Sequence, residues 1–448
     1  MRRVWSLMVV AIIAVGLGDA RLAAQPNERI ETPAVRAATQ LVERLNTGRF
    51  AEAAAVVDPA VPAGAFSAEA LQGLWTGLTQ QYGALQSVRP FRTGQQGAYH
   101  VVELDAAFAR QALRLRVVLD AEQRLSGLWI VPAEPAPYRP PSYADTAAFV
   151  ERQTRIGQVP WLLDATLTLP RRPGRVPGVV LVHGSGPHDR DESVDASRPF
   201  RDLAWGLASR GVAVLRYEKR SRAYVVRIDP DTFGLEQEVI ADALAAVQYL
   251  RTLPEIDPAR VYLVGHSLGG FLAPVIAERD GRLAGAVLLA ASARPSAELL
   301  REQLDYVFGL QPPAAEAEAA ERARLLARVD SLRAGTLAPT ARVLGAPVRY
   351  WRELDAQRPL DAARRIRTPL LVLQGERDYQ VTMADFRLWR RALSGRPATE
   401  FHSFPRLDHL FMPGEGRSTP QEYLGPQRHV APEVVERIAA WITGGSER

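Results

Sequence analysis

The sequence contains no cysteine, and this absence removes several kinds of chemistry. Disulfide bonds, thiolate metal sites and a cysteine nucleophile are all excluded. Lysine is nearly absent as well, because Lys219 is the only lysine among 55 Lys and Arg residues. The arginines are scattered among acids and form no long basic run, so the net charge of +5 does not indicate a phosphate-binding face. We therefore expect no nucleic-acid partner.

Patterns for metals and for phosphate-bearing cofactors are also missing. No pair of histidines has the helical spacing of a zinc site, and the acidic stretches lack the order of a calcium-binding loop. Glycine-rich loops of the P-loop or dinucleotide-binding type do not occur either. The sequence therefore predicts neither a metal nor a cofactor.

An apolar run lies near the N-terminus, and it is too short for a comfortable membrane span. Arg2 and Arg3 precede a mostly apolar stretch over residues 4–18, and small residues follow at Ala20 and at Ala23-Ala24. This order is typical of a secretory signal peptide, whereas a span needs about 20 apolar residues. We expect a signal peptide over residues 1–24, cleaved after Ala24, and a secreted or periplasmic protein with no stable membrane span after cleavage. An uncleaved anchor is the alternative.

The chain has 448 residues, of which 47% are hydrophobic, and this is enough for more than one domain. A proline cluster over residues 131–141 excludes helix and central strand, so residues 132–150 are interpreted as a linker. Before it, residues 34–45 and 67–82 have helical spacing, and residues 98–104 and 113–119 alternate as half-buried strands do. Residues 30–131 are therefore predicted to form a small α+β domain, which shows no catalytic cluster.

After the linker, over residues 151–448, short apolar runs alternate with helical segments. The runs are residues 178–183, 212–217, 261–264, 286–290 and 370–374, followed by a last strand over 399–405 and a final helix over 432–442. Continuous apolar strands between helices indicate an α/β fold, with a mostly parallel sheet and helices on both faces. The strand rhythm stops over residues 294–367, where an Ala-, Glu- and Arg-rich helical stretch suits a cap over the mouth of the sheet.

A serine lies between glycines directly after one of these strands, in Gly265-His-Ser-Leu-Gly269. A sharp turn from strand to helix would expose the Ser267 hydroxyl at a helix N-terminus, where N–H groups favour developing negative charge. The alternative is an ordinary strand-to-helix turn.

A serine nucleophile needs a base and an acid that orients the base, and both follow in the chain. Asp378 lies in the loop after the strand 370–374, with Glu376 as a competing acid, and His409 lies in the loop after the last strand. The carboxyl ends of parallel strands face a common crevice, so these residues are expected to meet Ser267 there. His188, in an earlier loop, is the rival base.

The other histidines fit less well as bases. His402 is predicted inside the last strand, and His429 lies near the start of the final helix. His266 is next to the serine but is expected to turn away from it, because neighbouring side chains diverge at such a turn.

Two backbone N–H groups are needed to stabilise an oxyanion. Leu268, directly after the serine, supplies the first. The second is expected from the loop over residues 184–192, where Ser185 or Gly186 can turn an N–H inward. The alternative is that His-Gly-Ser-Gly is only a flexible turn.

Several residues near this crevice have two open interpretations. The charged run Asp189-Arg-Asp-Glu192, with Arg198, Arg201 and Lys219-Arg220, would either grip a carboxylate or sugar or form an ion-pair network that holds the loop; we favour the network. Tyr350 and Trp351 would either line an acyl pocket or anchor the cap to the body. The candidate pocket residues are His183, Gly186, Tyr350 and Trp351.

Taken together, residues 155–445 resemble an α/β-hydrolase of the secreted esterase type, related to the dienelactone-hydrolase and acyl-esterase branch. The motifs that carry the resemblance are His183-Gly-Ser-Gly-Pro-His-Asp-Arg-Asp-Glu192, Leu215-Arg-Tyr-Glu-Lys-Arg220, Gly265-His-Ser-Leu-Gly-Gly270, Gln374-Gly-Glu-Arg-Asp-Tyr-Gln-Val381 and Asp408-His409-Leu-Phe. The resemblance implies the α/β-hydrolase fold, Ser267 as nucleophile, His409 as base and Asp378 as its orienter. The sequence departs from the family pattern at Ser221-Arg-Ala-Tyr-Val, where such hydrolases often have glycines. This departure affects the expected shape of the nearby pocket wall and not the triad.

The expected function is therefore a serine hydrolase that cleaves small-molecule carboxylic esters through an acyl-enzyme. A peptidase or amidase with the same triad is one alternative. A non-catalytic binding protein on a hydrolase scaffold is another, and the intact serine, acid and histidine in this order argue against it. Neither the acyl group nor the oligomeric state is indicated by the sequence.

Overall fold

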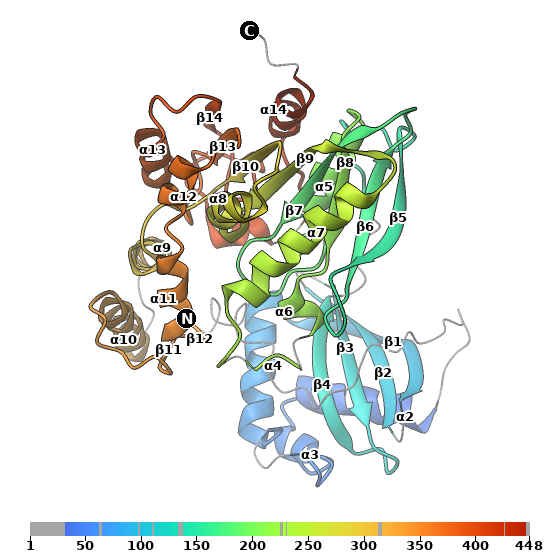
Figure 1. The fold of residues 1–448 in the computed structure, drawn as a ribbon. Helices are drawn as coiled ribbons and strands as arrows, with labels where there is room; N and C mark the ends of the chain where they lie inside the picture. Colours follow the sequence, from blue (N-terminus) through green and yellow to red (C-terminus); the bar gives the residue numbers. More distant parts are fainter. Residues whose placement is uncertain are drawn as a thin grey trace. The chain divides into compact units, whose positions relative to one another are not determined.

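The structure is a computed structural model that divides into two compact units, Met1–Pro137 and Tyr138–Arg448 (Figure 1). It describes residues 32–61, 65–96, 99–109, 112–132, 138–224, 227–229, 231–311, 316–424 and 426–444. The predicted signal peptide lies outside the described residues. In the described ranges, no helix is both long and apolar enough to cross a membrane.

The first unit is a small α+β fold, as predicted. Its helices are α2 Pro33–Asn46, α3 Phe50–Ala54 and α4 Ala68–Tyr82, and its antiparallel sheet has the order β1 Leu85–Gln96, β2 Tyr99–Phe108, β3 Ala112–Leu119, β4 Leu125–Pro132. Thr32 and Ser67 cap the two longer helices by accepting backbone N–H groups. Alternate residues of β2, such as Val102 and Leu104, share a core with buried residues of α2 and α4.

The second unit is built on an eight-stranded sheet with the order β14-β13-β10-β9-β7-β8-β6-β5. The hairpin β5–β6 and the β6–β8 pair are antiparallel, and the other neighbours are parallel. The strands are β5 Phe149–Ile156, β6 Leu163–Pro170, β7 Val176–Val182, β8 Ala213–Tyr217, β9 Ile256–His266, β10 Gly285–Leu289, β13 Leu370–Gly375 and β14 Thr399–Phe404.

Helices cover both faces of this sheet (Figure 1). Every residue of β7 is buried, because Val180 and Val182 pack on one face while Val179 and Leu181 pack on the other. The first face is covered by α7 Ala241–Thr252, α8 Leu268–Asp280, α12 Pro359–Arg365 and α13 Met383–Ala392, and the second by α5 Pro199–Ala208 and α14 Pro432–Thr443. The other helical segments of the body are α6 Arg220–Ala223, the π-helical turn η1 Glu236–Ile240 and the 3₁₀ turn η2 Pro420–Tyr423.

A helical insertion separates β10 from β13, as the break in strand rhythm predicts. It contains α9 Ser296–Gly309, α10 Glu316–Arg333, a short hairpin of β11 Arg342–Val343 and β12 Ala346–Pro347, α11 Val348–Ala356 and α12 Pro359–Arg365. Three of its helices share a small core of their own, which includes Leu300, Val329 and Val348. The insertion is therefore a packed subdomain rather than a long loop.

The chain joins the second unit earlier than the proline-rich stretch suggests. Tyr143 Oη donates to the carbonyl of Val430 at 2.8 Å, and Tyr138 Oη donates to Asp202. β5 then begins at Phe149. The later part of the predicted linker is thus held against the body by tyrosine hydroxyls.

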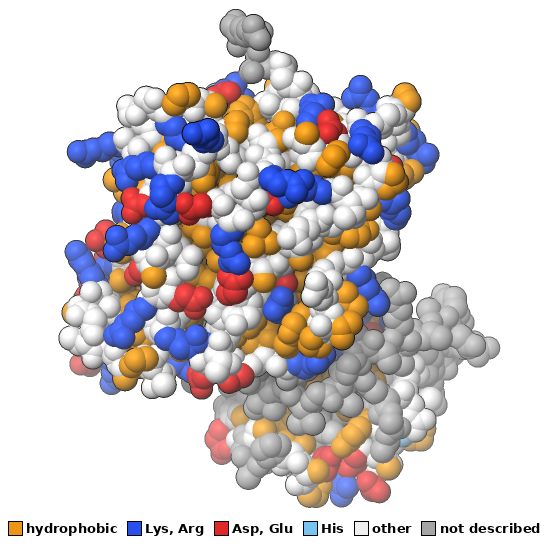
Figure 2. All heavy atoms as spheres, viewed as in Figure 1, with side chains coloured by type: hydrophobic (Ala, Val, Ile, Leu, Met, Phe, Trp, Pro, Cys, Tyr) orange, Lys and Arg blue, Asp and Glu red, His pale blue; other side chains and the backbone are white. Residues whose placement is uncertain are grey.

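Charges of both signs are interspersed on the face drawn in Figure 2, over the second unit. Many of the arginines pair with acids, for example Arg251 with Asp280 and Arg365 with Glu278. Part of the positive charge of the second unit is therefore offset by ion pairs.

Candidate active site

Ser267 alone separates β9 from α8, and the turn at this residue is strained. Its φ of 53° and ψ of −112° are unusual for a residue with a side chain. The Ser267 N–H donates to the Leu289 carbonyl at 2.8 Å. A Cβ on Gly265 would collide with the backbone of Gly269, and one on Gly269 would collide with the Val182 carbonyl. Glycine is therefore required on both sides of this serine, as in a nucleophile elbow.

An acid and a histidine from two later loops meet at the carboxyl edge of the same sheet. Asp378 follows β13, His409 follows β14, and His409 Nδ1 lies 2.6 Å from Asp378 Oδ2. The other carboxylate oxygen of Asp378 accepts the N–H groups of Gln380 and Val381 at 2.7 and 2.9 Å. Gln374 Nε2 donates to Oδ2 at 3.1 Å. The Asp378 carboxylate is thus fixed in place and directed at the histidine.

The competing candidates are engaged elsewhere. Glu376 accepts a hydrogen bond from Ser403 Oγ at 2.7 Å. His402 lies within β14 as predicted, and His429 Nδ1 pairs with Asp202 at 2.9 Å. The His188 ring nitrogen Nε2 lies 2.7 Å from the Ser185 carbonyl. Of the acids and histidines considered from the sequence, the structure brings together Asp378 and His409.

The loop that presents His409 is shaped by the residue before it, which sequence reasoning missed. Asp408 Oδ1 accepts the N–H groups of Leu410 and Met412 at 2.9 and 3.0 Å, and Arg428 pairs with its other oxygen at 3.0 Å. The Asp408 side chain is fully buried, and this burial raises its pKa above the ordinary value. The signal for this role in the sequence was the position of Asp408 directly before His409.

The loop after β7 lies directly against the serine. A Cβ built on Gly184 would lie 3.2 Å from Ser267 Cβ. The Gly184 N–H is occupied, because it donates to Glu192 Oε1 at 2.6 Å. Within the described residues, the N–H groups of Ser185 and Gly186 have no protein acceptor. Leu268 begins α8, so its N–H has no intrahelical acceptor either. These free N–H groups suit an oxyanion.

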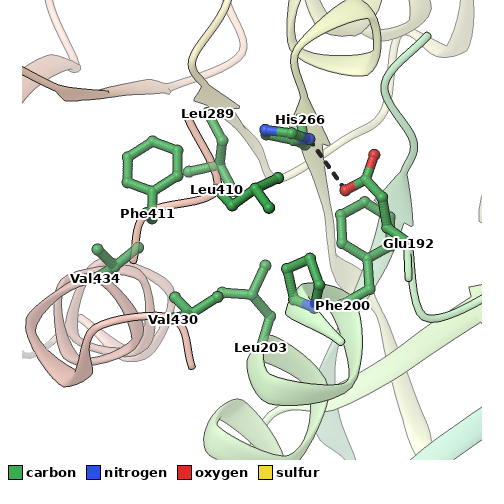
Figure 3. Close-up of a pocket in the computed structure, with 10 residues that line it drawn as sticks. Glu192, Phe200, Leu203, His266, Leu289, Leu410, Phe411, Val430 and Val434 are labelled. Carbon is green, nitrogen blue, oxygen red and sulfur yellow. Dashed lines mark ion pairs between the residues drawn. The ribbon is translucent and has the colours of Figure 1, made fainter. Parts of the chain in front are cut away.

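Glu192 and His266 form a buried ion pair beneath this loop (Figure 3). His266 Nδ1 lies 3.0 Å from Glu192 Oε2, and His266 Nε2 lies 2.9 Å from the His409 carbonyl. Burial opposes the charge on each group, but the pair outweighs it. The pKa of His266 is raised, and the pKa of Glu192 is lowered to about 2. A cavity of about 10 Å³, otherwise lined by apolar side chains, adjoins the pair.

His266 was expected to turn away from the serine, and its ring lies between Glu192 and the backbone of His409. The Glu192–His266 pair therefore joins three segments: the loop after β7, the serine turn and the histidine loop. Sequence reasoning missed this role, although an acid at the end of the loop motif and a histidine beside the serine were both visible.

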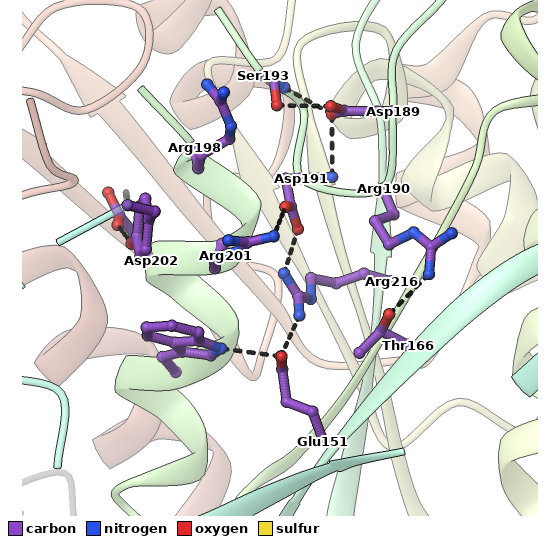
Figure 4. Close-up of polar contacts among 12 residues, drawn as sticks. Glu151, Thr166, Asp189, Arg190, Asp191, Ser193, Arg198, Arg201, Asp202 and Arg216 are labelled. Atoms are coloured by element: carbon purple, nitrogen blue, oxygen red, sulfur yellow. Dashed lines mark hydrogen bonds and ion pairs between the residues drawn. The ribbon is translucent and has the colours of Figure 1, made fainter. Parts of the chain in front are cut away.

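The charged run in the loop after β7 is neutralised within the protein (Figure 4). Asp191 pairs with Arg201 at 2.6 Å and with the buried Arg216, which also pairs with Glu151. Asp189 accepts hydrogen bonds from the side chain and N–H of Ser193. These contacts favour the ion-pair network that holds the loop over a substrate-gripping role.

The remaining candidate pocket residues make structural contacts, and the contact of Trp351 lies within the insertion. His183 is 1% exposed, and its Nε2 lies 3.0 Å from the Asp189 carbonyl. Burial lowers the pKa of His183 to about 3, so its ring is neutral. Tyr350 Oη donates to Glu238 at 2.8 Å, and Trp351 Nε1 donates to the Val343 carbonyl at 3.1 Å. Across the described ranges, no group of three or more His, Asp or Glu side chains could hold a metal ion.

Known proteins resemble both parts of this chain. A sequence model of the alpha/beta hydrolase family matches residues 179–424, and a model described as "Protein of unknown function (DUF3887)" matches residues 38–128. Esterase EstD of Thermotoga maritima is 37% identical over 376 residues, which cover 84% of this chain and 87% of that protein.

Solved structures of esterases are similar at lower identity. Est1E of Butyrivibrio proteoclasticus is 17% identical, with a TM-score of 0.44, over 65% of this chain and 99% of that chain. A hyperthermophilic esterase of Pyrobaculum calidifontis is also 17% identical, with a TM-score of 0.44, over 66% of this chain and 86% of that chain. The family match over more than half of the sequence and the identity to the Thermotoga protein establish that the chain belongs to the alpha/beta hydrolase family.

Proposed function

We propose that the chain is a carboxylic ester hydrolase that uses Ser267 as nucleophile, His409 as general base and Asp378 as the acid that orients it. The observation that carries this proposal is the 2.6 Å contact between His409 and Asp378, at the sheet edge where the strained turn presents Ser267. Asp378 accepts from Nδ1, which leaves His409 Nε2 to accept the proton of the serine hydroxyl.

The reaction follows from these positions. Ser267 Oγ attacks the ester carbonyl carbon while His409 Nε2 takes its proton, and the oxyanion accepts hydrogen bonds from the Leu268 and Ser185 N–H groups. The C–O bond to the alcohol then breaks, and His409 returns the proton to the departing alkoxide. Water, activated by the same histidine, attacks the acyl-enzyme and releases the acid and free Ser267.

Support for an ester substrate comes from the Thermotoga maritima relative, which is named an esterase. A peptidase or amidase would use the same groups, so the two activities need a direct comparison. We expect p-nitrophenyl acyl esters to turn over and aminoacyl p-nitroanilides to react far more slowly. A series of acyl chain lengths, extended to acetylated sugars, would define the acyl group.

The proposal is tested by removing the two reacting side chains one at a time. Ser267→Ala and His409→Gln should each reduce ester turnover by at least about 10³-fold, and Ser267→Ala should abolish labelling by a fluorophosphonate probe. The matched controls are Ser331→Ala, in α10, and His402→Gln, in β14. Ester turnover that survives in Ser267→Ala would rule out this mechanism.

A further inference from the structure

The only lysine of the chain is buried beside the candidate oxyanion loop. Lys219 is 1% exposed, and its Nζ donates to the Gly184 carbonyl at 2.6 Å. The same ammonium pairs with Glu238 Oε1 at 2.7 Å. Burying an ammonium is costly, and an apolar side chain of similar volume often stabilises a core as well. The arrangement therefore calls for a role beyond stability.

Glu238 connects this lysine to the helical insertion. It lies in the π-helical turn η1, and its second carboxylate oxygen accepts the hydroxyl of Tyr350 at 2.8 Å. Tyr350 belongs to α11 of the insertion. π-helical turns are rare and often occur at functional sites. A continuous path of two hydrogen bonds and one ion pair thus runs from α11 to the Gly184 peptide.

The same helix also holds the segment that leads into η1. Glu353 Oε1 accepts the N–H of Leu235 at 2.9 Å, and Arg349 donates to the Phe233 carbonyl at 2.9 Å. Movement of α11 away from the body would therefore pull on the residues that carry Glu238.

Gly184 is held at both of its polar groups. Its N–H donates to Glu192 and its carbonyl accepts from Lys219, and both partners are buried. The next two residues, Ser185 and Gly186, carry the N–H groups that lack a protein acceptor within the described residues. A shift of Lys219 would therefore rotate the Gly184 peptide and redirect these N–H groups.

We propose that Lys219, Glu238 and Tyr350 are positioning residues that couple the seating of the helical insertion to the oxyanion loop. We call these three residues the relay. This inference rests on the proposed ester hydrolase function, because it assigns the relay an effect on the oxyanion. When α11 is seated, Tyr350 orients Glu238, Glu238 holds Lys219, and Lys219 fixes the Gly184 carbonyl. When α11 lifts, Gly184 loses one of the two hydrogen bonds that hold its peptide groups.

The single lysine supplies a direct probe of this relay. Reductive methylation with formaldehyde and a borane reagent modifies amines, and the only amines of the chain are Lys219 and the N-terminal amino group, which serves as an internal reference. Peptide mass spectrometry then reports how often Lys219 becomes accessible. Tyr350→Phe removes one hydroxyl, and we expect it to raise the rate of Lys219 methylation about tenfold relative to that reference.

The matched control is Tyr306→Phe. Tyr306, in α9 of the same insertion, also donates its hydroxyl to the body, where the acceptor is the Ser418 carbonyl at 2.7 Å. This control should leave the methylation rate of Lys219 within about twofold of the wild type. Equal acceleration in both variants would mean general loosening of the insertion and would overturn the relay.

Kinetics test the coupling to the oxyanion. Tyr350→Phe should lower kcat for a p-nitrophenyl ester by about three- to tenfold and Lys219→Met by about 10- to 100-fold, with little change in KM, because oxyanion contacts strengthen in the transition state. The double variant should be no slower than Lys219→Met alone. Multiplied losses, or a change confined to KM, would overturn the proposal.

The outcomes separate this inference from the proposed function. A folded wild-type protein without ester turnover contradicts the function, whereas normal wild-type turnover with an unchanged Tyr350→Phe variant contradicts the relay. If Lys219→Met fails to fold by circular dichroism, the methylation and kcat of Tyr350→Phe still decide, because that change removes only a hydroxyl group.

Discussion

At the scale of single residues, the site depends on buried charges that each serve more than one neighbour. Glu192 has a positive φ of 50°, is 2% exposed and divides its two oxygens between Gly184 and His266. Such a residue is costly in both backbone conformation and desolvation. We infer that it is tolerated because it fixes the loop, the serine turn and the histidine loop relative to one another.

Replacing Glu192 by glutamine separates its charge from its shape. The amide oxygen can still accept the Gly184 N–H, but the ion pair with His266 is lost. We expect kcat for a p-nitrophenyl ester to fall about tenfold with little change in KM. Glu255→Gln, which breaks a partly exposed pair with Arg152, is the matched control and should be neutral. Full activity of Glu192→Gln would show that the ion pair has no positioning role.

The pH dependence of stability follows from His183. Burial lowers its pKa to about 3, whereas in the unfolded chain the pKa is about 6.5, so below pH 6.5 the unfolded state binds a proton that the folded state does not. The stability contributed by the neutral ring is therefore present above pH 6.5 and is lost as the pH falls towards 3. The lowered pKa of Glu192 adds a loss between pH 4.5 and about 2.

We therefore expect urea unfolding to give lower stability at pH 4.5 than at pH 6.5, with a slope of up to about 1.4 kcal/mol per pH unit from His183 alone. His183→Asn should show a shallower slope over this range, even if its stability at neutral pH is reduced by poorer packing. Identical slopes in the two proteins would mean that His183 does not titrate in this way.

At the scale of elements, the parallel strands were the most predictable part of the fold. β7, β8, β10 and β13 are buried along their whole length, and such strands leave uninterrupted apolar runs in the sequence. The hairpin β5–β6 escaped prediction, because only the ends of β5, Phe149 and Ile156, are buried. The interior of β5 faces β6 through polar cross-strand contacts, such as Gln153 with Thr166, although β6 itself contributes Leu163 and Leu167 to the core.

The serine, the acid and the histidine were predictable for a related reason. Each follows a predicted strand, so topology alone placed them at one edge of the sheet. Which of Asp378 and Glu376 pairs with the histidine depends on the turn at Gln380 and Val381, whose N–H groups hold Asp378. The contacts of Lys219 and Glu192 join segments far apart in the chain, and no local pattern predicts such pairs.

The close packing of the serine turn between β9 and α8 allows a prediction of stability. In Gly265→Ala the new methyl group would meet the backbone of Gly269, which cannot move without shifting α8. We expect the free energy of unfolding of the second unit to fall by about 2–5 kcal/mol and ester turnover to be lost. In the control Gly309→Ala, where nothing lies within 4 Å of the new methyl group, the change should be neutral or slightly stabilising. Near-normal stability of Gly265→Ala would contradict this packing.

At the scale of the whole molecule, each of the two units has core clusters of its own. The first unit has a core of its own, formed by its helices and one face of its sheet. The second unit has core clusters on both faces of its sheet and a smaller one in the insertion. Ser267, Asp378, His409 and the residues that hold them all lie within residues 138–448. The chemistry is therefore expected to reside in the second unit.

This division predicts that a fragment of residues 138–448 folds and keeps a reactive Ser267. It begins at Tyr138, whose hydroxyl contacts Asp202 of the same unit, so the start of the fragment is anchored. We expect its fluorophosphonate labelling rate to lie within about threefold of that of the full chain, because the contacts that position Ser267, Asp378 and His409 are retained. Labelling should require Ser267, so the Ser267→Ala fragment is the control. A fragment that is folded by circular dichroism but unreactive would show that the first unit acts on the site. The role of the first unit would then have to be sought in catalysis rather than in binding or targeting.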